Sequence, residues 1–225
     1  MRFSSLAKQC ISFAENCLLT IIHKSKCNLS MPLKTSDNTK VKDSLKGHFL
    51  LAMPSLDAGL FAKSITYLIE HGEEGAMGLI INRPLDLAIS EVFDQLEIKS
   101  SASLNCIPIM AGGPVQMDQG FVLHRDKVSN WEACIEVSDE VLLTTSQDIL
   151  FSIAEDQGPK ETLIALGYAG WSPGQLEEEL AKNSWLTMPA DSDIIFSTPY
   201  DQRFSQAAAQ IGVDMNLISS QIGHA

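Results

Sequence analysis

The sequence predicts an α+β protein with a mostly antiparallel β-sheet. Strand-like and helix-like segments mix along the 225 residues without the steady strand–helix–strand order of a parallel sheet. Residues 64–71 carry β-branched and aromatic side chains, and residues 76–82 return after the turn 72–75, which indicates a β-hairpin. No repeat of fixed period is present in the sequence.

Strands are expected where a short apolar run lies between turn residues. The first strand, 47–54, is closed by Pro54, and the hairpin ends at Arg83-Pro84, since proline has no N–H for a β-ladder. The later strand-like segments are 107–110, 120–124, 141–144, 163–166, 184–188 and 194–196.

Helices are expected where apolar residues recur every three or four positions. The predicted inward-facing residues are Leu85, Ile89, Val92, Phe93 and Leu96 in the first helix; Ile149, Leu150, Ile153 and Ala154 in a helix from about residue 146; and Phe204, Ala208 and Ile211 in a helix from about residue 200. A fourth helix is predicted over 173–182.

The start of the 173–182 helix overlaps a pattern typical of serine hydrolases. Residues 170–174 match G-x-S-x-G, but Pro173 follows the serine and has no N–H to bind an oxyanion. One lost oxyanion donor costs about 10²–10³ in rate. Ser172 is instead expected to be the N-cap, with Gln175 completing a capping box. We therefore predict no catalytic residue.

The charge divides the chain into two parts. Residues 1–46 hold eight basic and three acidic residues, a net charge of +5, whereas residues 47–225 hold eight basic and 25 acidic residues, a net charge of −17. We predict an N-terminal extension over 1–46, either disordered or a start-site artefact if Met31 begins the protein, and one domain over 47–225. A basic targeting peptide is the alternative.

The acidic domain limits the classes of partner. A net charge of −17 repels phosphate backbones, so direct nucleic-acid binding is not expected. The apolar run 17–22 is too short to span a bilayer, and no membrane contact is predicted. Five cysteines without a C-x-x-C pair fit free thiols in a cytoplasmic protein, with a redox or metal role as the alternative.

The histidines and glycines do not indicate a cofactor. The five histidines lack H-x-x-x-H spacing, so no metal site is predicted, although His48, His71 and His124 lie in strand-like segments that could converge. The glycines near residue 170 lack the lysine and Ser/Thr of a nucleotide-binding loop. No cofactor is therefore expected.

A polar surface is the remaining candidate site. Arg83 follows a strand and could hold a carboxylate or phosphate in a bidentate manner, although an internal ion pair is favoured. Trp171 lies beside three glycines and is either a core anchor or a stacking platform. The predicted ligand or partner surface consists of Asn82, Arg83, Tyr168, Trp171 and Gln175.

Four motifs carry a family resemblance. They are Gly47-His-Phe-Leu-Leu-Ala-Met-Pro54, Gly78-Leu-Ile-Ile-Asn-Arg-Pro84, Gly112-Gly-Pro114 and Gly167-Tyr-Ala-Gly-Trp-Ser-Pro-Gly-Gln-Leu176. In this order they resemble the AlgH/YqgE family of bacterial proteins. The resemblance implies a compact α+β fold with a small closed β-barrel region flanked by helices. The family is functionally uncharacterised, and some members are named as transcriptional regulators.

Two functions remain open from the sequence. The first is a binding or regulatory module that contacts an unknown protein partner or small ligand rather than DNA. The alternative is a cofactor- or anion-binding enzyme on a small-barrel scaffold, which rests on fold analogy. Thermal stabilisation by flavins or nucleotides would favour the alternative.

Overall fold

The structure is a computed structural model that describes residues 44–56, 59–95, 107–127 and 131–213. Its strands are β1 His48–Ala52, β2 Ile65–Gly72, β3 Gly75–Ile80, β4 Pro84–Ala88, β5 Pro108–Ala111, β6 Val115–His124, β7 Cys134–Ser138, β8 Val141–Thr144, β9 Thr162–Trp171 and β10 Trp185–Pro189. Its helices are α2 Ile89–Gln95, α3 Asp148–Ala154, α4 Gln175–Ala181, α5 Ser192–Phe196 and α6 Arg203–Gln210, with short 3₁₀ turns at Pro54–Leu56 and Gly59–Phe61.

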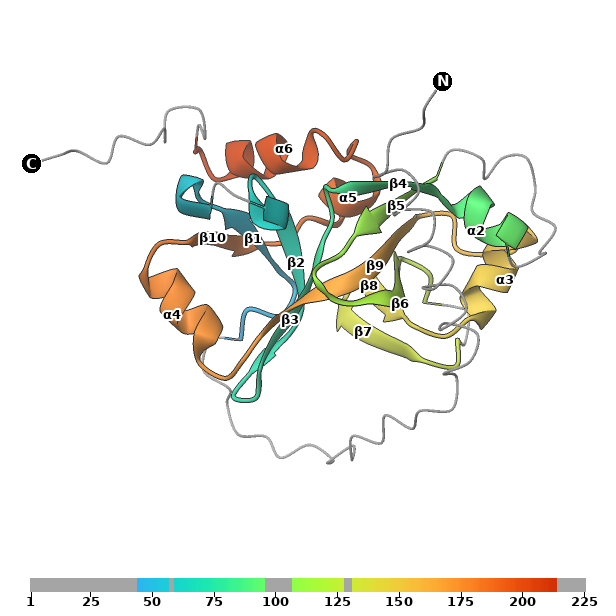
Figure 1. Cartoon of the computed structure of the whole chain (residues 1–225), viewed down its shortest axis with the longest axis horizontal. Coiled ribbons are helices and arrows are strands. Elements are labelled where there is room, and N and C mark those ends of the chain that lie inside the picture. Colours follow the sequence, from blue (N-terminus) through green and yellow to red (C-terminus); the bar gives the residue numbers. More distant parts are fainter. Residues whose placement is uncertain (1–43, 57–58, 96–106, 128–130, 214–225) are drawn as a thin grey trace, which may run out of the picture.

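The described strands form one curled, mostly antiparallel sheet, as the sequence predicts (Figure 1). The strand order is β10-β1-β2-β3-β9-β6-β8-β7, and every neighbouring pair on this path is antiparallel. Strand β5 adds a parallel pairing to β9 and an antiparallel pairing to β4. The α+β class is confirmed.

The small closed barrel implied by the family resemblance is not shown. The strand path ends at β10 and β7, and no ladder among the described strands joins these two ends. Strand β10 leads almost at once into α5, so the chain turns helical instead of continuing the ladder. Isolated side-chain contacts bridge the opening, such as Tyr67 Oη to Ser138 Oγ at 3.4 Å. The sheet is a half-barrel.

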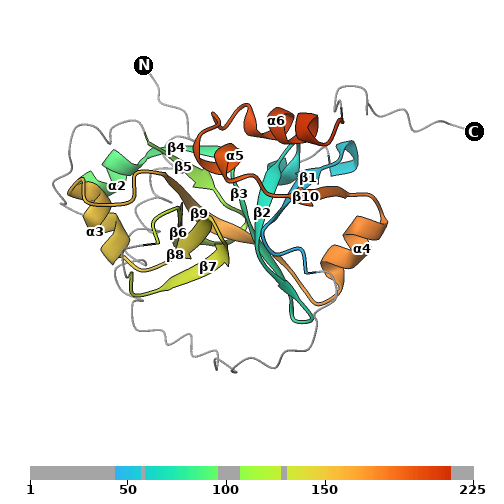
Figure 2. The same ribbon diagram turned by 180° about the vertical axis from the view of Figure 1, so that it is seen from behind.

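Three apolar clusters hold the layers together. The largest lies inside the curl, where side chains of the strands meet those of α5 and α6. A second packs β5, β6 and β9 against α2 and α3, and a third packs β1, β2, β9 and β10 against α4. Figures 1 and 2 show α4 at one end of the sheet, α2 and α3 at the opposite end, and α6 along the top.

Strand β9 belongs to both halves of the sheet. Its residues 169–171 pair with β3, and its residues 162–168 pair with β6. Where the two halves meet, the backbone at 112–113 crosses close to β9. A Cβ at Gly113 would lie 2.0 Å from the carbonyl carbon of Tyr168, and a Cβ at Gly112 would lie 2.2 Å from the carbonyl oxygen of Gly167. Only glycine fits at this crossing.

Two segments have a different type of secondary structure from the one that the sequence predicts. Residues 84–88 form β4 and not the first turn of a helix, because Pro84 and Ala88 pair with β5. Residues 194–196 lie in helix α5 and not in a strand. The carboxylate of Asp191 accepts the N–H of Asp193 at 2.9 Å, which makes Asp191 the N-cap of α5. Strand β7 was not predicted.

The start of α4 also differs from the prediction. The helix begins at Gln175 and not at Pro173, because Gly174 has a φ of 77° and interrupts helical geometry. The side chain of Ser172 makes no capping hydrogen bond to this helix. The reciprocal half of the capping box does form, since Gln175 Oε1 accepts the N–H of Ser172 at 3.1 Å.

The glycine crossing yields a stability prediction. We expect Gly113→Ala to lower the free energy of unfolding by at least about 2 kcal/mol, because the new methyl overlaps the backbone of β9. The matched control is Gly120→Ala in β6, where a Cβ meets no atom within 4 Å. Urea denaturation measures both variants. Equal stability of Gly113→Ala and Gly120→Ala would contradict the close crossing.

Candidate functional site

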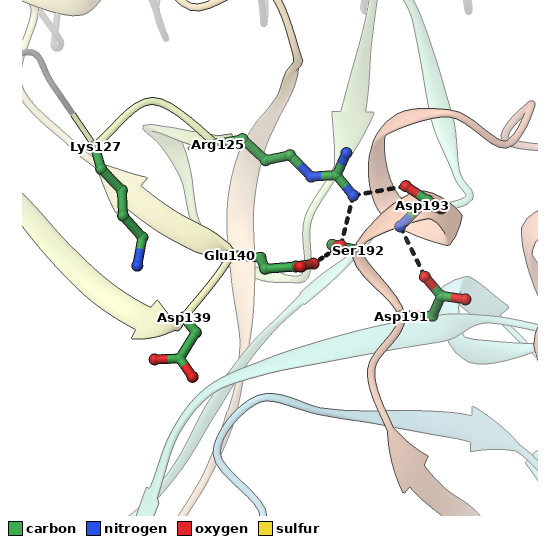
Figure 3. A pocket seen from close by; sticks show the side chains of 7 residues that line it. All are labelled: Arg125, Lys127, Asp139, Glu140, Asp191, Ser192 and Asp193. Atoms are coloured by element: carbon green, nitrogen blue, oxygen red, sulfur yellow. Dashed lines mark hydrogen bonds and ion pairs between the residues drawn. The ribbon is translucent and has the colours of Figure 1, made fainter.

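An open groove of about 540 Å³ lies where the two ends of the strand path approach each other (Figure 3). Three segments supply its side chains: the chain after β6, the turn between β7 and β8, and the start of α5. We call it the Arg125 groove, and its lining residues are Arg125, Lys127, Asp139, Glu140, Asp191, Ser192 and Asp193. The lining is almost entirely charged.

Arg125 organises the groove. Its Nη1 donates to Glu161 Oε1 at 2.9 Å, and its Nη2 donates to Asp193 Oδ1 at 2.7 Å and to Ser192 Oγ at 2.5 Å. Its guanidinium lies 5.3 Å from the centre of the Phe196 ring. The hydrogen bond that Arg125 donates to Asp193 is the main cause that raises the pKa of Arg125, so the guanidinium stays charged.

Ser192 joins two parts of the groove. Its hydroxyl accepts from Arg125 and donates to the carboxylate of Glu140 in the β7–β8 turn. Ser192 is only 7% exposed. Because the hydroxyl is held on both sides, its evident role is to fix α5 to the opposite edge of the sheet. Asp191 supports the same position through a hydrogen bond from Gln210 at 2.7 Å.

The outer part of the groove keeps unneutralised negative charge. Lys127 pairs with Glu136 at 3.0 Å. No ion pair in the described part of the chain involves Asp139 or Glu140. Figure 3 shows Asp139 apart from the bonded network around Arg125. With two basic and four acidic lining residues, the groove favours a cationic group.

The predicted surface residues Asn82 and Arg83 lie just beyond the end of β3. Asn82 Oδ1 accepts the N–H of Ile65 at 3.0 Å, and its Nδ2 donates to the carbonyl of Lys63 at 2.9 Å. Asn82 thus holds the entry to β2, where Lys63 has a φ of 51°. Arg83 is half-buried, and its Nε is buried without a hydrogen-bond partner. Its predicted ion pair is absent among the described residues.

The predicted residues Trp171 and Gln175 meet at Glu179 of α4. The indole N–H groups of Trp171 and Trp185 both donate to Glu179 Oε2, at 2.9 and 2.8 Å, and Gln175 Nε2 donates to Oε1 at 3.0 Å. Burial opposes the charge on Glu179, but these hydrogen bonds and nearby Lys182 hold its pKa below the ordinary value. Trp171 is 7% exposed and anchors the core between sheet and helix.

The five predicted surface residues do not form one surface. Trp171 pairs with Ala76 at the start of β3, whereas Asn82 lies six residues further along the chain, about 20 Å at the rise of an extended strand. Tyr168 is half-buried and packs edge-to-face on Phe121 with ring centres 5.9 Å apart. None of the five lines the Arg125 groove. Contact of these residues with a ligand stays a prediction.

Sequence reasoning missed the Arg125 groove. One signal was available, because Arg125 is one of only three arginines in residues 47–225 and follows the predicted strand 120–124. Its partners could not be read from the sequence, since Glu161, Ser192 and Asp193 lie 36, 67 and 68 residues away.

A cysteine–histidine pair lies elsewhere, near the edge of the sheet. Cys134 Sγ is 3.9 Å from His124 Nε2, which also lies 2.9 Å from Thr144 Oγ1. Burial lowers the pKa of His124, although Asp126 acts in the opposite direction. A neutral, buried imidazole does not stabilise a thiolate, so the pair does not indicate a nucleophile. Within the described ranges, no group of three or more His, Cys, Asp or Glu could hold a metal ion.

The described α-helices are short, from five residues in α5 to eight in α6. In the parts of the chain that the structure describes, no helix has the length and apolar character needed to cross a bilayer.

Comparison with known proteins identifies close relatives. The AlgH-like family model matches residues 49–216. A UPF0301 protein of Saccharophagus degradans is 50% identical over 182 residues, which cover 81% of this chain and 89% of the relative. A UPF0301 protein of Pseudomonas aeruginosa is 51% identical over 183 residues, which cover 80% of this chain and 96% of the relative.

Two solved structures share the fold. The solution structure of AlgH from Pseudomonas aeruginosa matches with a TM-score of 0.67 and 49% identity, over 86% of this chain and all of that one. The crystal structure of a Corynebacterium diphtheriae protein matches with a TM-score of 0.61 and 19% identity, over 80% of this chain and 93% of that one. The second similarity concerns the fold alone.

The Glu179 cluster yields a prediction about pH. Because hydrogen bonds lower the pKa of Glu179 in the folded protein, its carboxylate contributes stability above the ordinary carboxyl range, and this contribution is lost as the pH falls through the folded pKa. We expect Glu179→Gln to lower the free energy of unfolding by about 2 kcal/mol at pH 7, and by less in acid.

The control for this prediction is Glu178→Gln on the exposed face of α4. Among the described residues, the Glu178 carboxylate pairs only with Lys182 Nζ, at 3.8 Å, and the loss of its charge should change stability by less than about 0.5 kcal/mol. Urea denaturation at several pH values measures both variants. A Glu179→Gln deficit that does not shrink as the pH falls would contradict the role of the carboxylate.

Proposed function

The chain belongs to the AlgH-like family, and we propose that it is a cytoplasmic binding module that recognises a protein partner through the Arg125 groove. The observation that carries this proposal is the character of the groove, which is open and lined by charged side chains from three segments. A regulatory effect of the protein would then act through protein contact.

The lining of the groove favours a protein over a small molecule. Small-molecule sites are mostly apolar and enclose the ligand. None of the residues that line the Arg125 groove is apolar, and the nearby ring of Phe196 packs against the Arg125 guanidinium. Protein interfaces combine anchored arginines with a polar rim, which is the arrangement around Arg125.

The charge of the groove disfavours direct contact with nucleic acid. Its lining has four acidic and two basic residues, and the domain around it has a net charge of −17. Both repel phosphate groups. The groove therefore supports a partner that presents cationic side chains.

Charge reversal at the rim tests this proposal. Asp139 faces the groove and has no ion pair with a described residue, so Asp139→Lys should leave the fold intact and weaken partner binding by about tenfold. Quantitative affinity capture and titration of the captured partner measure the effect. Glu178→Lys on α4 makes the same charge change away from the groove. If both variants bind the partner as the wild type does, the groove is not the contact surface.

A second candidate function is anion binding at Arg83. The supporting observation is its guanidinium, which is half-buried with an unpartnered Nε and no described ion pair. Under this alternative, inorganic phosphate or a flavin mononucleotide should raise the melting temperature, and Arg83→Gln should remove the gain. The Arg125→Gln variant should melt at a lower temperature than the wild type without ligand, but the ligand should raise its melting temperature by the same amount. No stabilisation of the wild type by either compound would exclude this candidate.

A further inference from the structure

Strand β7 is the last strand on its side of the sheet, so one of its edges has no neighbouring strand in the described fold. The carbonyl of Ala133 accepts the N–H of Thr145, and Ile135 pairs with Leu143 of β8. Backbone groups alternate in direction along a strand, so those of Glu136 point away from β8. The 2.9 Å hydrogen bond from Lys46 Nζ to the Glu136 carbonyl agrees with this direction.

The side chains of β7 also differ from those of an ordinary protected edge. Ile135 is 42% exposed and offers an apolar contact beside the edge. Lysine side chains commonly block such edges, and Lys46 occupies one outward carbonyl. The end of the strand is also approached by Gly47, where a Cβ would lie 3.9 Å from the Val137 carbonyl oxygen and 3.7 Å from Ser138 Cβ. The stretch 134–136 is therefore the more open part of the edge, and Lys46 blocks it only in part.

We propose that the free edge of β7 accepts an extended, lysine- or arginine-bearing segment of a partner protein as an added strand. This inference rests on the proposed function and names how the partner docks. Asp139 and Glu140 of the Arg125 groove follow the last residue of β7, so long basic side chains of a segment paired with residues 134–136 can extend toward these two carboxylates. Backbone hydrogen bonds hold the segment, and alternate side chains contact Ile135 and the groove.

The charge of the β7 edge favours a basic partner segment over a second copy of the chain. Strand β7 and its flanks carry four acidic residues, Glu132, Glu136, Asp139 and Glu140, against two lysines, Lys46 and Lys127, which both bond to Glu136. Two copies paired antiparallel through this edge would bring these carboxylates together, which is destabilising. A basic segment places opposite charges there instead. The edge therefore fits a cationic partner strand better than it fits itself.

A peptide probe tests strand addition. The probe is a blocked decapeptide of alternating lysine and valine. The first control has the same sequence with every backbone amide N-methylated, so that neither edge can donate a hydrogen bond, and the second alternates glutamate with valine. We expect the lysine–valine peptide alone to bind, and to slow amide hydrogen exchange at residues 134–138 of the full chain.

Two variants of the protein locate the contact. Glu136→Pro removes the outward N–H without removing a bond to β8, and should weaken the peptide about five- to tenfold relative to Glu136→Ala, which keeps that N–H. Lys46→Ala frees the Glu136 carbonyl and should strengthen binding about two- to fivefold. Thermal denaturation confirms that each variant is folded.

Four results would overturn strand addition: no binding of the lysine–valine peptide, equal binding of its N-methylated form, equal affinity of Glu136→Pro and Glu136→Ala, or dimerisation of Lys46→Ala in sedimentation. The same variants distinguish failure of strand addition from failure of the proposed function. If Asp139→Lys weakens the natural partner while Glu136→Pro does not, the groove is the contact surface and the edge of β7 is not.

Discussion

The fold depends on one close backbone crossing. The chain at Gly112 and Gly113 passes over β9 at Gly167 and Tyr168, at distances that exclude any side chain. This contact lets a single ten-residue strand, β9, pair with β3 at one end and with β6 at the other. The crossing thus brings the two halves of the sheet close together at their common strand.

The crossing also explains where the Arg125 groove lies. Because β9 joins the halves on one side, the free ends of the strand path, β10 and β7, approach each other on the other side. The two ends are joined by side chains, chiefly the Arg125 bonds to Ser192 and Asp193 and the Ser192 bond to Glu140. A closed ladder would leave no such groove. The incomplete barrel is therefore the physical basis of the candidate site.

Local patterns in the sequence predicted much of the sheet. The 64–82 hairpin and the 163–166 strand follow from apolar runs between turn residues, and both are present, although β9 continues beyond residue 166 through the glycines to Trp171. The errors occurred where a local contact outweighed the pattern. The apolar spacing around residues 84–88 predicts a helix, but their pairing with β5 makes them a strand. The apolar run 194–196 predicts a strand, but the Asp191 cap makes 192–196 a helix. The groove was not predictable, because it unites residues up to 68 positions apart.

The central claim is that the Arg125 groove contacts a protein. Site-specific photocrosslinking tests it most directly, with a photoreactive amino acid at position 139 on the groove rim and, as reference, at position 178 on α4. The account predicts a protease-sensitive, nuclease-resistant adduct with a polypeptide from position 139 alone. A nucleic-acid adduct, or the same polypeptide adducts from both positions, would contradict it.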